Sequence, residues 1–157
     1  MTNNEPSPPP EVVGAHMLAA DRASRGLGMS LVAIGAGTAT MRMTVRDDML
    51  NGHDICHGGF ITTLADSAFA FACNAGNQVT VASSLAVDFL APAHAGDVLT
   101  AEAREVSRGG RTGVYDMVVR NHSGATVALV RGRSAALKGR SVMPADAAPS
   151  TTTGEAT

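Results

Sequence analysis

Residues that could perform chemistry gather in one stretch of the chain, residues 51–77, which reads NGHDICHGGFITTLADSAFAFACNAGN. It begins as a polar loop and continues as an apolar helix whose first turn contains His57, Gly58 and Gly59. Asp66 lies inside that helix among apolar residues, although carboxylates are rarely buried unless they are paired. The free N–H groups of a helix N-terminus stabilise negative charge. The stretch therefore predicts a base together with a site for a developing oxyanion.

The same stretch allows three other interpretations. His53, Cys56 and His57 form an HxxCH pattern that offers three zinc ligands without a clear fourth. Cys56 could act as a nucleophile, because a helix N-terminus lowers the pKa of a thiol. Asp66 could be an ordinary helix residue that is solvated or bonded to a neighbouring hydroxyl group.

Length and composition predict one small domain. Of the 157 residues, we expect 1–11 to be a disordered proline-rich leader, 12–138 to fold, and 139–157 to form a disordered tail. The formal net charge of -2 and the scarcity of aromatic residues argue against nucleic acid as a partner. We find no signal peptide and no apolar run that could span a membrane, so we expect a soluble cytoplasmic protein.

Hydrophobic periodicity predicts one long helix and six strands. Apolar residues follow helical spacing over residues 57–75 and cover most sides, which indicates a helix wrapped by other elements. A shorter helix is predicted over residues 16–25. Alternating patterns predict strands at 29–34, 39–45, 79–89, 98–107, 112–120 and 126–137. Because helices and strands do not alternate, the expected fold class is α+β, with a mainly antiparallel sheet of five to six strands around the long helix.

Three segments resemble a known family: NGHDICHGGFITTLADSAFAFACN, VASSLAVDFLAPAHAGDVLTA and GRTGVYDMVV. They are similar to the hotdog-fold acyl-CoA thioesterases of the phenylacetate-degradation (PaaI) type. The resemblance implies a hotdog fold and hydrolysis of phenylacetyl-CoA, hydroxyphenylacetyl-CoA or a related aryl-acyl-CoA. It also implies a homodimer with active sites at the subunit interface, paired into a homotetramer. Coenzyme A enters as part of the substrate, and neither a metal nor a cofactor is expected.

The resemblance also implies roles for individual residues. Asp66 is expected to act as the base or the nucleophile. The Gly58 N–H is expected to contact the oxyanion, with His57 orienting the carbonyl group. We expect further substrate contacts from Asn51, Gly59, Ser67, Ser83, Ser84 and Arg111. For each of these residues the alternative is an ordinary structural role.

A geometric argument independent of the family concerns Gly58 and Asp66. They are eight residues apart, which corresponds to ~12 Å along a helix that rises about 1.5 Å per residue. Both groups must come within hydrogen-bond distance of one thioester. One copy of a continuous helix cannot do this, so we predict that the two groups in each site come from different subunits.

Two rival functions are compatible with the same residues. A hotdog hydratase or dehydratase would use a histidine and an acid, such as His57 and Asp66, to transfer protons at carbon. A non-catalytic acyl-CoA-binding protein would bind the thioester without cleaving it. Release of free coenzyme A distinguishes both from a thioesterase.

Overall fold

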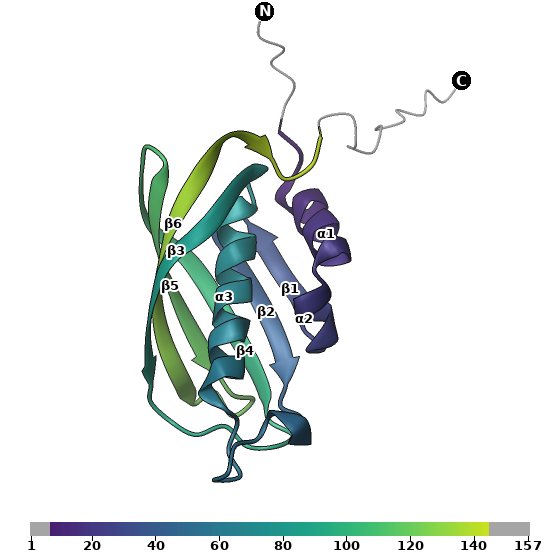
Figure 1. Ribbon diagram of the computed structural model, residues 1–157, viewed down its shortest axis with the longest axis vertical. Coiled ribbons are helices and arrows are strands. Elements are labelled where there is room, and N and C mark those ends of the chain that lie inside the picture. Colours follow the sequence, from purple (N-terminus) through teal and green to yellow (C-terminus); the bar gives the residue numbers. More distant parts are fainter. Residues whose placement is uncertain (1–6, 145–157) are drawn as a thin grey trace, which may run out of the picture.

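A computed structural model describes residues 7–144, which form three α-helices, one short 3-10 helix and six β-strands. Figure 1 shows the helices beside and within a curved sheet. In chain order the elements are α1 (Pro10–Ala20), α2 (Arg22–Gly26), β1 (Ser30–Gly35), β2 (Thr38–Thr44), η1 (Asp47–Met49), α3 (Gly58–Asn74), β3 (Gln78–Phe89), β4 (Val98–Gly109), β5 (Thr112–Arg120) and β6 (Thr126–Ser141).

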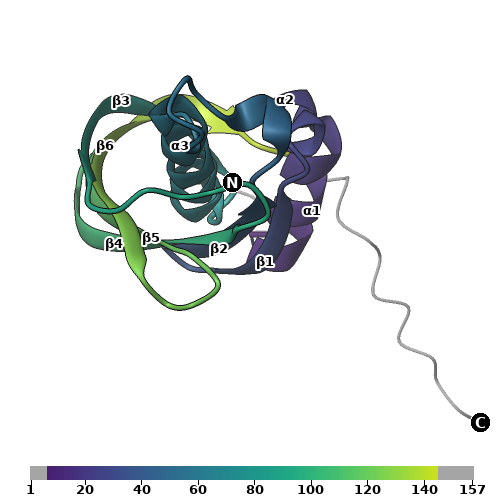
Figure 2. The ribbon, with the colours of Figure 1, turned by 90° about the horizontal axis from the view of Figure 1, so that it is seen from below.

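The six strands form one sheet in the order β1-β2-β4-β5-β6-β3, and every neighbouring pair is antiparallel. The sheet curls around α3, while α1 and α2 lie beside it (Figure 2). The apolar stripe of α3 packs against the concave face, where it buries residues such as Ile61, Leu64, Ala68 and Phe69. The predicted fold class, a mainly antiparallel sheet around a long central helix, is confirmed.

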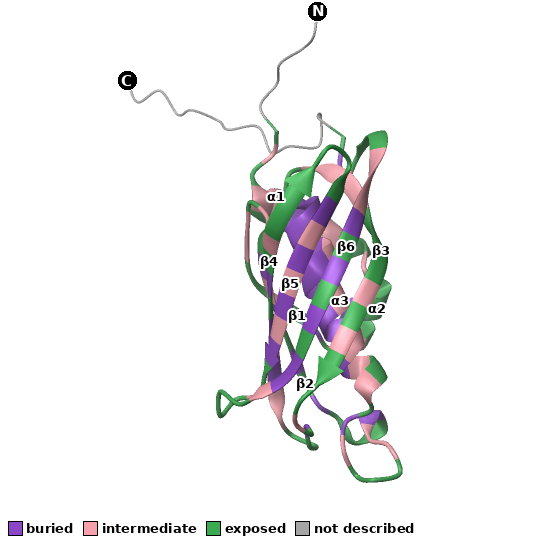
Figure 3. Ribbon diagram, turned by 90° about the vertical axis from the view of Figure 1, so that its left-hand side faces the viewer, coloured by how far each residue is buried: buried purple, intermediate pink, exposed green. Residues whose placement is uncertain are grey.

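Burial alternates along the central strands because successive side chains point to opposite faces of a sheet. In β5, Gly113, Tyr115, Met117 and Val119 are buried toward α3, and the residues between them are partly exposed. Figure 3 shows this alternation along β5 and its neighbours. The edge strand β3 differs, since none of its residues is fully buried.

The predicted helix over residues 16–25 is in fact two helices. Asp21 ends α1, and its side chain caps α2 by accepting a hydrogen bond from the Ser24 N–H at 2.9 Å. The sequence prediction missed this break. A single capping residue such as Asp21 can separate two short helices without visibly interrupting the helical spacing of the apolar residues. The first helix also begins nearer the N-terminus than predicted. It starts at Pro10, in the first turn, where proline is favoured because the N–H that it lacks would have no partner there.

The predicted boundaries of the folded unit differ from the observed elements at both ends. Pro10 and Glu11 of the predicted leader belong to α1, and β6 continues to Ser141, into the predicted tail. Residues 7–9 and 142–144 lie outside the helices and strands, and residues 1–6 and 145–157 of those two predictions lie outside the described residues. None of the helices within residues 7–144 is long and apolar enough to cross a membrane.

Candidate active site

The first turn of α3 presents a free backbone donor. His57 is the N-cap residue, and its Nδ1 atom accepts a hydrogen bond from the Gly59 N–H at 3.0 Å. The Phe60 N–H donates to the His57 carbonyl oxygen at 3.0 Å. The Gly58 N–H has no hydrogen-bond partner among residues 7–144. It is therefore available to bind an oxyanion, with the helix dipole adding to the attraction.

Gly58 lies directly beneath an aromatic ring. A Cβ atom placed on Gly58 would approach Cζ of Phe89 to 2.8 Å, so only glycine fits without displacing that ring. Both residues line an open cavity of about 550 Å³, together with Asn51, Ile55, Cys56, Ile61, Leu90, Ala91 and Pro92. Phe89 is 54% exposed although it is large and apolar. Sequence analysis did not single out Phe89, even though it stands in the DFLAP segment.

Asp66 lies in the middle of α3 and is half-buried. It makes no hydrogen bond or ion pair with any residue from 7 to 144. Burial raises the pKa of its carboxyl group, because a charged carboxylate loses hydration that nothing in the chain replaces. An unpaired, partly desolvated carboxylate is a stronger base than an ordinary aspartate, as base or nucleophilic catalysis requires.

The hydroxyl group of Ser67, next to Asp66, is bound to a residue that sequence analysis missed. Ser67 Oγ lies 3.0 Å from Ser24 Oγ, and Ser24 Oγ donates to Asp21 Oδ2 at 2.6 Å. Ser24 belongs to α2, is 1% exposed and contacts α3 through Ser67. The spacing of Asp21 and Ser24 is typical of a helix cap and could have indicated the local pair. Nothing in the sequence indicated the contact with Ser67, which is 43 positions away.

Other predicted substrate contacts lie farther along the molecule. Asn51 lines the cavity around Gly58, and its Oδ1 accepts from the His53 N–H at 2.9 Å, so it also holds the loop that leads into α3. Ser83 donates to the Arg133 carbonyl oxygen at 3.0 Å, and Ser84 is exposed opposite Arg133 in the β3–β6 ladder. The structure thus gives Asn51 and Ser83 structural hydrogen bonds and leaves Ser84 open to solvent.

Arg111 lies in a basic cavity of about 290 Å³ beyond the C-terminal end of α3. The residues lining it include Arg108, Arg111 and Lys138 and no carboxylate. The hydroxyl of Ser134, a residue only 3% exposed, also borders this cavity. Such a set of cations and hydroxyl donors suits phosphate groups.

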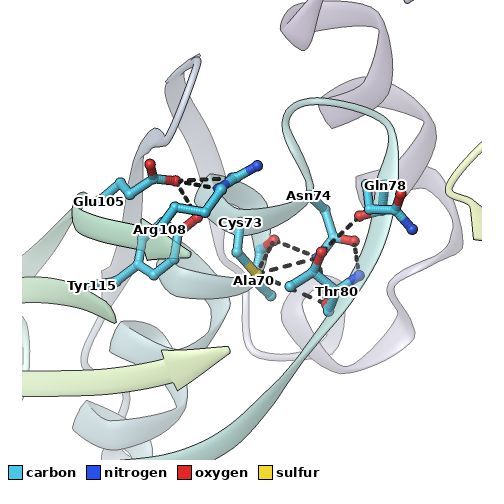
Figure 4. Close-up of polar contacts among 8 residues, drawn as sticks. All are labelled: Ala70, Cys73, Asn74, Gln78, Thr80, Glu105, Arg108 and Tyr115. Atoms are coloured by element: carbon cyan, nitrogen blue, oxygen red, sulfur yellow. Dashed lines mark hydrogen bonds and ion pairs between the residues drawn. The ribbon is translucent and has the colours of Figure 1, made fainter. Parts of the chain in front are cut away.

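The guanidinium group of Arg108 is held in place by two neighbours (Figure 4). Arg108 donates to Glu105 Oε2 at 2.9 Å and to Tyr115 Oη at 3.0 Å. Tyr115 in turn donates to Glu105 Oε2 at 2.7 Å. Burial, together with the hydrogen bond to Glu105, raises the pKa of Tyr115 to about 12.

Asn74 ties the end of α3 to the start of β3, as Figure 4 also shows. Its side chain donates to the Thr80 carbonyl oxygen and accepts from the Thr80 N–H, both at 2.8 Å. It also donates to the Ala70 carbonyl oxygen at 2.9 Å. The edge strand is therefore held in fixed register with the helix that carries Gly58 and Asp66.

Comparison with known proteins places the chain in a family. The family model described as "Thioesterase superfamily" matches residues 53–128. Acyl-coenzyme A thioesterase PaaI of Escherichia coli (strain K12) is 47% identical over 114 residues, which are 73% of this chain and 81% of that protein. The chain belongs to the PaaI type of hotdog-fold acyl-CoA thioesterases. The family resemblance seen in the sequence is confirmed.

Solved structures agree with this assignment. The structure of the E. coli PaaI protein from the phenylacetic acid degradation operon is 43% identical, with a TM-score of 0.79 over 83% of this chain and 96% of that one. A Streptococcus mutans UA159 protein bound to acetyl CoA is 26% identical, with a TM-score of 0.68 over 71% of this chain and 90% of that one. The hotdog fold is confirmed, and the protein is a thioester hydrolase.

In this PaaI-type thioesterase, Gly58 and Asp66 lie on one uninterrupted helix, α3. Eight residues of regular helix separate them by ~12 Å along the axis. A single copy of the chain therefore does not bring the free N–H and the unpaired carboxylate to one point. The geometric premise of the two-subunit prediction holds.

The alternative chemistries for this thioesterase receive little support from the structure. Burial and the charge of Asp97 raise the pKa of Cys56, so its thiol is less reactive than the predicted helix effect would make it. Burial also raises the pKa of Cys73, to about 12. Within the described part of the chain, no three His, Cys, Asp or Glu side chains are placed to hold one metal ion.

Proposed function

We propose that this protein hydrolyses aryl-acyl-CoA thioesters, such as phenylacetyl-CoA or hydroxyphenylacetyl-CoA, to the free acid and coenzyme A in the cytoplasm. The observation that carries the proposal is the pair of unpartnered groups on α3, the Gly58 N–H and the Asp66 carboxylate. The names of the E. coli relatives, which refer to acyl-coenzyme A and to phenylacetic acid degradation, support the substrate class.

The chemistry follows from these groups. Asp66 removes a proton from a water molecule as its oxygen attacks the thioester carbon, or attacks that carbon itself. The carbonyl oxygen becomes an oxyanion, which Gly58 binds through its N–H. His57 can add a second hydrogen bond, because Nδ1 is an acceptor toward Gly59 and the ring proton of the neutral imidazole is therefore on Nε2. With water as the nucleophile, collapse of the intermediate expels the coenzyme A thiolate, which takes up the proton held by Asp66. With Asp66 as the nucleophile, collapse expels the thiolate and leaves an acyl–Asp66 anhydride. A water molecule then hydrolyses this anhydride, which releases the acid, regenerates Asp66 and supplies the proton that the thiolate takes up.

A homodimer would supply both halves of each site. Within residues 7–144, β3 is an edge strand with no neighbour on one side, and large apolar side chains such as Val81 and Phe89 are 45% and 54% exposed on it. Such an edge is suited to pairing with a second copy. Phe89 lies level with Gly58. Asp66 is ~12 Å farther along α3, a distance that about four residues of the antiparallel strand β3 cover at ~3.3 Å each. Asp66 is therefore about level with residue 85. A two-fold axis near Val87 would then bring Gly58 of the second copy beside Asp66.

The basic cavity gives the coenzyme A moiety a place in this arrangement. It lies beyond the C-terminal end of α3, and Asn74 at that end is eight residues from Asp66, or ~12 Å. The phosphates of a thioester held at Asp66 can therefore reach Arg111 and Lys138 of the same copy. The S. mutans protein with bound acetyl CoA supports a CoA thioester as the ligand. The proposal requires no metal and no cofactor, and it includes the pairing of two dimers into a homotetramer.

The test is release of thiol from a panel of acyl-CoAs. We expect turnover of aryl-acetyl thioesters by the wild type and a loss of about 10²–10⁴-fold in Asp66→Asn, which keeps the shape and removes the base. Release of free coenzyme A separates a thioesterase from a hydratase or a binding protein. Wild-type turnover by Asp66→Asn, or no thiol release from any acyl-CoA, would reject the proposal.

Mixed dimers test whether each site uses two subunits. Gly58→Pro removes the N–H but suits this first helical position, because His57 before it has ψ 130°, a conformation that proline allows. Gly58→Ala is the matched control, since it adds a Cβ against Phe89 and keeps the N–H. Neither Gly58→Pro nor Asp66→Asn should be active alone. Mixing and refolding them should restore about a quarter of wild-type activity, because half the dimers are mixed and each has one intact site. No restoration would exclude shared sites.

A further inference from the structure

A directed chain of hydrogen bonds leads from α2 to the residue after Asp66. Asp21 accepts two bonds from Ser24: one from the backbone N–H at Oδ1, 2.9 Å long, and one from the hydroxyl at Oδ2, 2.6 Å long. A carboxylate can only accept, so the single proton of the Ser24 hydroxyl is directed at Asp21. In the 3.0 Å contact between the two serines, Ser67 must therefore donate and Ser24 must accept.

This direction determines what Ser67 can offer a ligand. Its only proton is used toward Ser24, and both lone pairs of its oxygen have no partner among residues 7–144. Ser67 is half-buried, whereas Ser24 is 1% exposed. Toward a substrate, Ser67 is therefore a hydrogen-bond acceptor, polarised by the carboxylate at the far end of the chain.

The side of α3 on which Ser67 lies indicates which part of the substrate it meets. Ser67 faces α2, whereas Phe69 packs against Gly132 of β6. The two residues are about 160° apart around the helix, and Asp66 projects between them. The basic cavity is lined by Arg111, Ser134 and Lys138 on the β6 side. With the coenzyme A phosphates at this cavity, as the proposed function has them, coenzyme A would occupy the β6 flank and leave the α2 flank to the acyl group.

Ser67 and Asp66 cannot contact the same atom of the substrate, because neighbouring residues on a helix point in different directions. The group that Ser67 binds must lie some bonds away from the thioester carbon. We propose that Asp21 and Ser24 are positioning residues that make Ser67 a hydrogen-bond acceptor, so that the site selects acyl groups bearing a hydrogen-bond donor. This inference rests on the proposed function and adds which feature of the acyl group the site recognises, namely a hydrogen-bond donor.

A single substitution should reverse the chain. In Asp21→Asn, the Ser24 backbone N–H still needs an acceptor, so the amide oxygen takes the place of Oδ1. The amide NH₂ then replaces Oδ2 and donates to the Ser24 hydroxyl, which must turn its proton to Ser67. The Ser67 proton is released toward the ligand. Asparagine caps helices as well as aspartate does, so the variant should fold.

The experiment compares aminophenylacetyl-CoA, which presents a donor, with methoxyphenylacetyl-CoA, which presents only an acceptor. Each is used as its three ring isomers, and the ratio of kcat/KM values is taken for each isomer pair. We expect the wild type to favour the amino compound of at least one isomer pair, and Asp21→Asn to shift that ratio by about tenfold toward the methoxy compound. Ser24→Ala should bring the ratio closer to one. Asp47→Asn, an exposed aspartate, is the matched control and should keep the wild-type ratio.

Binding of non-hydrolysable thioether analogues, measured by calorimetry, gives a second readout that does not depend on turnover. The same reversal between wild type and Asp21→Asn is expected in their dissociation constants. Equal ratios in the two proteins, by kinetics or by binding, would overturn the inference. If the reversal appears in binding while no acyl-CoA is hydrolysed, the inference stands and the proposed thioesterase function fails.

Discussion

The Nδ1 atom of His57 accepts a hydrogen bond from the N–H of Gly59, two residues later, at 3.0 Å. This bond caps α3 and consumes one of its free donors, while the Gly58 N–H stays free. It also selects the tautomer with the proton on Nε2, the nitrogen that points away from the helix end. One contact thus determines which groups at this end of α3 can bind a carbonyl oxygen.

His57→Asn separates the capping role of this side chain from its proposed contact with the substrate. Asparagine is a good N-cap residue but is too short to replace the Nε2 donor. We expect a melting temperature close to that of the wild type and a loss of kcat of about tenfold to a hundredfold. His57→Ala should lose the cap as well, at a cost of about 1 kcal/mol in unfolding free energy. Wild-type kcat in His57→Asn would show that the imidazole does not act on the substrate.

The pH dependence of activity should report the environment of Asp66. Burial raises the pKa of this carboxyl group, and the group must be ionised to act as base or nucleophile. The acid limb of the kcat/KM profile is therefore expected above the ordinary aspartate pKa of about 3.9. A limb at or below that value would contradict the assignment.

The pH dependence of the protein's stability should also report the raised pKa of the Asp66 carboxyl group. A raised pKa means that the folded state binds the proton more tightly than the unfolded state does. The stability from protonated Asp66 is complete below the unfolded pKa and is lost as pH rises through the folded pKa. Asp66→Asn should therefore raise the melting temperature at pH 7 relative to the wild type, and by less at acidic pH. A lower melting temperature for this variant at pH 7 would count against an unpaired charge.

Gly132 should tolerate no side chain. A Cβ atom there would approach the ring of Phe69 to 2.8 Å, and Phe69 is 1% exposed, so the ring has little room to move. Gly132→Ala should lower the unfolding free energy by about 1–3 kcal/mol, measured by urea denaturation. Gly109→Ala, where nothing lies within 4 Å, is the control and should cost nothing. Phe69→Leu should partly rescue Gly132→Ala, and equal stability of the two glycine variants would contradict the packing.

Tyr115→Phe should remove the hydroxyl that links Glu105 and Arg108. We expect a loss of about 1–2 kcal/mol in unfolding free energy, since both partners lose a bond at a buried position. The folded pKa of Tyr115 is about 12, above the ordinary value of 10.0. Its contribution is therefore present below pH 10 and lost as pH rises toward 12. Denaturation between these pH values should show the wild type approaching the variant, and a constant difference would exclude this role.

Much of the architecture could be predicted from the sequence, because it depends on local side-chain patterns. The helical spacing around Leu64 and Ala68 indicates which face of α3 is buried, and the alternation around Tyr115 does the same for β5. Neither pattern depends on what the element packs against. The same is true of the free N–H at Gly58, which follows from its place in the first turn of a helix. The eight-residue separation of Gly58 and Asp66, from which we predict a site shared by two subunits, could also be taken from the sequence.

Only the tertiary structure decided which groups are free and which are bound. Ser67 reaches Ser24 across 43 positions, and Phe89 covers Gly58 of α3 from the end of β3. Arg108 is held by Tyr115, across the β4–β5 hairpin. These contacts join segments brought together by the burial of α3 within the sheet, and individual contacts between different elements leave no periodic pattern in the sequence. The sequence determined the elements and the reacting groups, while packing between distant segments decided their orientation, their partners and the direction of their hydrogen bonds.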